Sequence, residues 1–158
     1  MSAWRGWLYW LYGQQEEAIN AARRSLELQP NSTVGLYVLG SVYAEQGRYE
    51  EAIATHRELS ELSRKWGWGL GHTLALAGRR DEARQILAAL KRRDSSNYWG
   101  AAEIHTALGE TDEAFRSLEM AYEFPHIWIA WVRELPNFAP LRSDPRFQDL
   151  VHRLELPD

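Results

Sequence analysis

Small, apolar and polar residues recur along this chain with a fixed spacing. The clearest copy is Leu39-Gly40-x-x-Tyr43-x-x-x-Gly47-x-x-x-x-Ala52. Partial copies begin 31 residues later at Leu70 and again at Ala101, and an earlier one begins at Gly6, 34 residues before Gly40. A period of this length predicts stacked helix pairs, each of which buries its apolar face against the next.

The repeated glycines mark the turns between the two helices of each pair, because glycine readily adopts the left-handed conformation that ends a helix. They are Gly13, Gly47, Gly78 and Gly109. An alanine follows each glycine five residues later, where two helices must approach closely: Ala18, Ala52, Ala83 and Ala114. The pattern predicts an all-α chain with four pairs in residues 1–125, at about 1–31, 32–65, 66–95 and 96–125.

Residues 126–158 depart from this repeat. The stretch 126–134 is apolar on almost every side and predicts one more short, buried helix. The following segment, 135–142, is expected to be extended because its two prolines disfavour helix. Ser143 or Asp144 caps a terminal helix near 145–155 with Pro145 at its first position. Its apolar stripe is expected to cover the end of the stack and consists of Phe147, Leu150, Val151 and Leu154.

The composition limits the classes of function. The 158 residues carry a net charge of −4, which argues against a general nucleic-acid binder, and Lys91-Arg92-Arg93 is best explained as a cationic helix end. No apolar stretch approaches the roughly 18 residues of a membrane span. The start of the chain lacks a signal-peptide pattern, and there is no cysteine. We therefore expect a cytoplasmic protein.

The motif residues resemble the tetratricopeptide repeat, and the second pair is the best match, with Leu36, Leu39, Gly40, Tyr43, Gly47 and Ala52. The resemblance implies a right-handed α-solenoid with a C-terminal capping helix. The stretch from Phe138 to Leu150 is similar to the end of such repeat regions in bacterial signalling proteins, where the repeats follow a cyclase, kinase, DNA-binding or TolB-like domain. None of those domains is present here, so the resemblance implies a scaffold role and no activity.

In this repeat family the first helices of successive pairs line a concave groove in which ligands commonly lie. Stepping along those helices selects the candidate groove residues Trp4, Trp7, Trp10, Tyr37, Ser41, Glu45, Trp68, Gly69, His72, Trp99, Gly100 and Glu103. Tyr37, Trp68 and Trp99 are equivalent in the repeat and predict an aromatic ladder. Gly69 and Gly100 are also equivalent. Because a glycine inside a helix costs about 1 kcal/mol relative to alanine, they indicate a close approach to the helix surface.

Signals for catalysis are poor, and we expect no enzyme, metal or cofactor. The five histidines have no metal-ligand spacing. Gly67-x-Gly69-x-Gly71 follows no strand and lacks the lysine of a phosphate loop. His72 and Glu103 could meet across neighbouring pairs as an acid–base couple, but a surface hydrogen bond is the better interpretation.

Three functions stay open. The first is a protein-interaction scaffold that binds a peptide or partner protein in the aromatic groove. The second is a self-association or assembly module whose groove is filled by its own tail, which carries Trp128, Trp131, Pro136, Phe138 and Pro140. The third is a small-molecule binder. The first pair carries more apolar surface than one neighbouring pair can cover, which suggests a homodimer through that pair with Trp7 or Trp10 near its centre.

Overall fold

The computed structural model describes residues 3–93, 97–124 and 127–154, and all of its regular structure is helical over these ranges. The first helices of the four pairs are α1 (Ala3–Leu11), α3 (Thr33–Glu45), α5 (Trp68–Leu76) and α7 (Tyr98–Leu108). Their second helices are α2 (Gln15–Leu28), α4 (Tyr49–Leu62), α6 (Arg80–Arg93) and α8 (Thr111–Glu123). A 3-10 helix, η1 (Arg64–Trp66), joins the second pair to the third.

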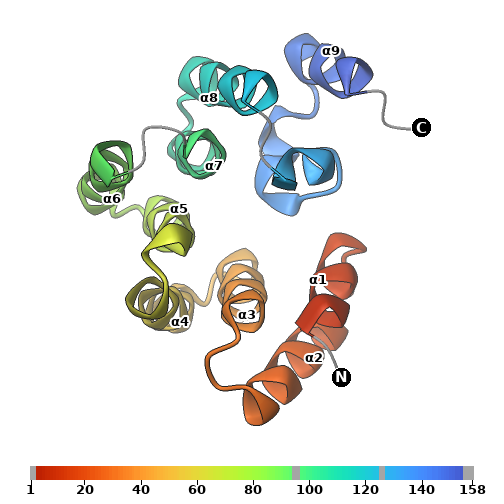
Figure 1. The fold of residues 1–158 in the computed structure, drawn as a ribbon, viewed down its shortest axis with the longest axis vertical. Coiled ribbons are helices and arrows are strands. Elements are labelled where there is room, and N and C mark those ends of the chain that lie inside the picture. Colours follow the sequence, from red (N-terminus) through yellow and green to blue (C-terminus); the bar gives the residue numbers. More distant parts are fainter. Residues whose placement is uncertain (1–2, 94–96, 125–126, 155–158) are drawn as a thin grey trace.

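Each helix packs against the partner of its own pair and against the next pair. Figure 1 shows the pairs following one another along an arc, with α3, α5 and α7 toward its inner side and α4, α6 and α8 outside. The expected all-α solenoid of helix pairs is confirmed. None of the helices in the described residues is long and apolar enough to cross a membrane.

The four turn glycines share one backbone geometry. Gly13, Gly47, Gly78 and Gly109 have φ values of 72°, 73°, 78° and 74°, in the left-handed region that other residues rarely adopt. The residue after each glycine donates its backbone N–H to a carbonyl oxygen five residues earlier, at 2.8–2.9 Å. These bonds satisfy carbonyls that the end of a helix would otherwise leave free. The glycines are therefore the turn markers that the sequence predicted.

Small residues allow the two helices of a pair to meet closely. Ala18, Ala52, Ala83 and Ala114 are completely buried. On the facing helix of the second pair, a Cβ atom added to Gly40 would lie 2.4 Å from the His56 ring. Larger side chains at these places would separate the helices.

After the repeats, the chain forms two 3-10 helices, η2 (Ile127–Trp131) and η3 (Pro136–Leu141). The expectation of an extended segment over 135–142 was wrong for η3. Proline's fixed φ suits the first turn of a helix, where its missing N–H costs no bond, and Pro136 occupies that place. The short helix expected at 126–134 is a 3-10 helix that begins at Ile127, and residue 126 lies outside the described ranges.

The terminal helix α9 (Pro145–Arg153) packs against α8. Asp144 caps it by accepting a hydrogen bond from the backbone N–H of Arg146, and Pro145 is at its first position, as expected. Phe147 and Leu150 are buried, while Val151 and Leu154 are half-buried against the same core. Residue 155, where the sequence suggested that the helix ends, lies outside the described residues.

Candidate functional site: the inner surface of the arc

The inner surface is built from equivalent positions of the four first helices. Each pair contributes one polar or indole group to the same row along this surface. The row consists of Trp7, Ser41, His72 and Glu103, which are separated by 34, 31 and 31 residues. The ring ladder, formed by Tyr37, Trp68 and Trp99, lies one helical turn earlier in pairs two to four. Repetition of the pair therefore places both rows along the arc.

Most of the candidate groove residues are buried in the chain itself. These buried positions are Trp7, Trp10, Tyr37, Ser41, Trp68, Gly69, His72, Trp99, Gly100 and Glu103. Trp4 and Glu45 are the exceptions, because both are exposed at the edge of the surface. Trp10 nevertheless contacts Glu45, donating its indole N–H to the carboxylate at 2.6 Å.

The two equivalent glycines allow close contact between successive pairs. A Cβ atom added to Gly100 would lie 2.7 Å from the Cβ of Trp68, and one added to Gly69 would lie 3.3 Å from the Tyr37 ring. The sequence suggested that something lies close to the helix surface at these glycines, and in the structure it is the preceding helix pair of the same chain. These glycines let the ladder rings pack against the next helix.

A buried polar cluster joins three distant parts of the chain. The Tyr37 hydroxyl lies 2.8 and 3.0 Å from the two carboxyl oxygens of Glu103. The Asn137 side-chain amide donates to Glu103 Oε2 at 2.9 Å and lies 3.1 Å from the Tyr37 hydroxyl oxygen. All three residues are buried, so these bonds replace the water that the polar groups lose on folding.

Burial dominates the electrostatics of this cluster. It raises the pKa of Glu103 to about 7, although the hydrogen bonds from Tyr37 and Asn137 and the indoles of Trp99 and Trp68 favour the charged form. Burial, followed by the charge of Glu103, raises the pKa of Tyr37 well above its usual value of 10. The tyrosine therefore stays protonated and serves as a donor to the carboxyl group.

An aromatic cluster continues from the polar cluster toward the first pair. The Trp7 ring lies 5.9 Å from Tyr37 and 5.1 Å from Trp128. Trp66 lies 5.5 Å from Trp128 and stacks on Trp68 at 5.1 Å. Pairs of this geometry add stabilisation beyond the area that they bury. The cluster covers Trp7 with residues of the same chain.

Two of the buried histidines, His56 and His72, lie beside this surface. Burial lowers the pKa of His56 to about 4 and that of His72 to about 3, so both are neutral near pH 7. His56 Nε2 donates to the Tyr37 carbonyl at 3.1 Å, which leaves Nδ1 to accept from the Thr73 hydroxyl at 2.8 Å. Within the part of the chain that the structure describes, the Nδ1 atom of His72 has no hydrogen-bond partner. His72 and Glu103 are both buried and Glu103 bonds to Tyr37 and Asn137, so the surface hydrogen bond between them that the sequence suggested was wrong.

Three residues of this surface escaped the sequence interpretation: Asn137, Trp66 and His56. Asn137 is a polar residue within the apolar stretch from Leu135 to Phe138, which is the one local signal of its role. Trp66 lies on the short connection η1, outside the repeated positions. Among the described residues, no group of three histidine, aspartate or glutamate side chains is placed to hold a metal ion.

The fold and this surface define a class of protein, a helical-repeat scaffold with a packed inner face. Family comparison identifies the repeat: the tetratricopeptide repeat matches the chain at residues 2–32, 21–54 and 67–89. The chain therefore contains tetratricopeptide repeats within its first three helix pairs. Repeats of this family generally mediate protein–protein interaction or assembly, and their fold is typically a non-catalytic scaffold. Comparison with curated proteins found no match.

Proposed function

We propose that this chain is a protein-interaction and assembly scaffold whose inner surface is occupied by its own residues 127–141, and that partners bind to its exposed faces. The observation that carries the proposal is the pair of hydrogen bonds that the Asn137 side-chain amide donates to the Tyr37 hydroxyl and to Glu103. The fit of the tail supports it further, since Phe138 is completely buried with its ring 5.0 Å from Trp99. A cytoplasmic location belongs to the same proposal.

Self-association is the assembly that the exposed surface supports best. An exposed stripe, called the α1 stripe below, consists of Trp4 and Leu8 on α1 and of Tyr12 directly after it. Its successive members are four residues apart, so they share one face of the helix. Their exposed fractions are 49%, 43% and 77%. Apolar stripes of this kind commonly mark an interface, and a two-fold dimer covers the stripe with its own copy.

The centre of this proposed dimer differs from the sequence expectation. Trp7 or Trp10 was expected near the centre of the interface, but both residues are buried inside the chain. Trp7 is covered by Tyr37 and Trp128, and Trp10 by Tyr37 and the Glu45 carboxylate. The proposed contact therefore uses the opposite, exposed face of α1.

Sedimentation velocity tests the assembly. We expect the mass to rise with concentration toward twice the 18.3 kDa of one chain, and Leu8→Glu to abolish that rise. Leu62→Glu is the matched control, because Leu62 on α4 has the same 43% exposure and lies outside the stripe. Self-association through α1 would be contradicted if the wild-type chain stays monomeric at tens of micromolar. It would also be contradicted if both variants lose the concentration-dependent rise in mass to the same extent.

Peptide recognition on the inner surface is the second candidate, and one observation favours it. Three buried atoms have no hydrogen-bond partner among the described residues: Trp7 Nε1, Ser41 Oγ and His72 Nδ1. A peptide that displaced residues 127–141 could satisfy these atoms with its own backbone or side chains. Asn137→Asp should weaken the tail by placing a second carboxylate beside Glu103. Peptide-library members that bind this variant more tightly than the wild type would support groove recognition, and equal binding would exclude it.

A further inference from the structure

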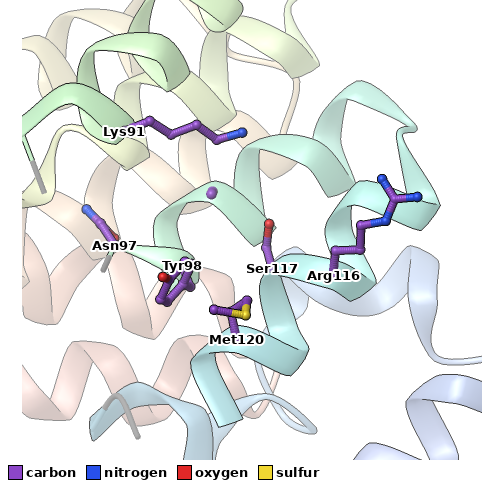
Figure 2. Close-up of a pocket in the computed structure, with 7 residues that line it drawn as sticks. Lys91, Asn97, Tyr98, Arg116, Ser117 and Met120 are labelled. Atoms are coloured by element: carbon purple, nitrogen blue, oxygen red, sulfur yellow. The ribbon is translucent and has the colours of Figure 1, made fainter. Parts of the chain in front are cut away.

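A hollow on the outer side of the arc lies where α6, α7 and α8 meet, away from the inner surface. Its volume is about 300 Å³, and its lining is Lys91, Asn97, Tyr98, Ala101, Arg116, Ser117 and Met120. Figure 2 shows Lys91, Tyr98, Ser117 and Met120 around the same space, whereas the Arg116 side chain extends away from it. The volume falls at the lower end of ligand cavities, which span roughly 300–1,000 Å³.

The charge in this hollow is positive. Among the described residues, its lining contains two cations and no acidic residue. Arg116 is already paired with Glu113, whereas Lys91 has no ion pair among the described residues. The helix α6 that carries Lys91 contains five basic and two acidic residues, although the whole chain has a net charge of −4. An anion is therefore attracted to this place against the overall charge of the protein.

The start of α7 adds to this preference. Asn97 caps α7 by accepting a hydrogen bond from the Gly100 N–H at 3.1 Å, so its carboxamide oxygen is already occupied. Tyr98, the first residue of the 11-residue helix, lines the hollow. The positive end of the helix dipole thus lies on the same side as Lys91. The hydroxyls of Tyr98 and Ser117 supply donors beside these charges.

The floor of the hollow is apolar. Ala101 and Met120 contribute it together with the Tyr98 ring. Methionine adapts its shape to irregular apolar groups, which suits a floor that must receive a side chain. A ligand that fits this site therefore combines a carboxylate with a bulky apolar group close to it.

A second hollow extends the surface across α8. It has a volume of about 620 Å³ and shares Arg116 and Met120 with the first; its other lining residues are Asp112, Phe115, Glu119 and Arg146. An extended chain rises about 3.3 Å per residue, so a few residues laid across α8 would reach both hollows. Two hollows flanking one ridge favour a peptide over a compact small molecule.

We propose that the outer face formed by α6, α7 and α8 binds an acidic peptide segment of a partner protein, with a carboxylate at Lys91 and a neighbouring apolar side chain on Met120. This inference rests on the proposed function, because it names one exposed face of the scaffold and the chemical class of partner that binds there. Lys91 and Met120 belong neither to the polar and aromatic clusters that contact the tail nor to the α1 stripe.

The chain offers a direct probe of this site, because Lys65 and Lys91 are its only lysines. Reductive ¹³C-methylation keeps their charge and gives each a separate NMR signal, assigned with the variants Lys65→Arg and Lys91→Arg. The ligand is a capped peptide of sequence Ser-Glu-Phe-Asp-Leu-Ser. Its control is the neutral counterpart Ser-Gln-Phe-Asn-Leu-Ser. We expect the acidic peptide to shift the Lys91 signal and leave that of Lys65, which is exposed on η1, unchanged.

Affinity measurements complete the test. Lys91→Met should weaken acidic-peptide binding about fivefold, the upper end for an exposed charge pair, while Lys65→Met should leave it unchanged. Absence of binding, equal shifts at both lysines, or equal binding of the neutral peptide would overturn the proposal. Binding of N-acetylglutamate as tight as that of the peptide would assign the site to a small acid and overturn the peptide occupant. Any of these results would leave the sedimentation test of self-association unaffected.

Discussion

Replacing Glu103 with glutamine should change how the stability of the protein depends on pH. The Glu103 side chain is completely buried and is held by the Tyr37 hydroxyl and the Asn137 amide. Burial raises its pKa from 4.5 to about 7. Glutamine keeps the shape and an acceptor oxygen but cannot titrate, so a comparison of the two proteins isolates the contribution of this carboxyl group.

The sign and size of the effect follow from linkage. Between pH 4.5 and about 7 the folded protein binds a proton at Glu103 that the unfolded chain has released. The stabilising contribution is therefore fully present below pH 4.5 and is lost as the pH rises through 7. The separation of the two pKa values corresponds to about 3 kcal/mol. Wild type should thus lose about 3 kcal/mol relative to Glu103→Gln between pH 4.5 and pH 8.

Urea unfolding followed by tryptophan fluorescence measures this difference at pH 5, 6, 7 and 8. The buried His56 and His72, whose pKa values are lowered to about 4 and about 3, destabilise both proteins in acid and so cancel in the comparison. A stability difference that stays constant across this range would refute the reasoning. It would mean that the Glu103 carboxyl group is solvated or paired with a cation in solution.

Three further predictions test the packing by urea unfolding. Gly40→Ala should lower the stability by about 1–3 kcal/mol, because its Cβ would overlap the fixed His56 ring; an unchanged stability would show that the helices can separate freely. Phe138→Ala should cost about 3–5 kcal/mol if η3 is part of the core, and a loss below 1 kcal/mol would mean that η3 is detached. Leu150→Ala should cost about 2–5 kcal/mol, whereas no change would show that α9 leaves the end of the stack uncovered.

The repeated part of the fold could be predicted because its signals are local. A left-handed glycine such as Gly47, followed five residues later by a fully buried alanine such as Ala52, fixes the turn and the closest contact of a pair. Equal spacing also placed Tyr37 and Trp68 on the same side of successive helices. These features depend on the backbone preference and the size of individual residues, and both properties follow directly from the residue type.

The surroundings of the inner surface could not be predicted in the same way. The bond between Asn137 and Tyr37 joins residues 100 positions apart, and no periodicity relates them. The 3-10 conformation of η3 was missed because Pro136 and Pro140 suggested an extended chain, whereas Pro136 stands in the first turn of the helix, where proline is tolerated. The exposure of Trp7 on α1 was overestimated because the Trp128 ring, which belongs to the tail, packs against it. Each of these features depends on where the chain goes after its last repeat.

The measurement that tests the central claim most directly is an NMR experiment on the uniformly labelled 18.3 kDa chain. If residues 127–141 occupy the inner surface, nuclear Overhauser contacts should connect the side-chain amide protons of Asn137 with the ring protons of Tyr37. The ring protons of Phe138 and Trp99 should show the same type of contact. Absence of both contacts, with narrow and exchange-averaged amide signals from 127–141, would contradict the account and leave the inner surface open to a partner.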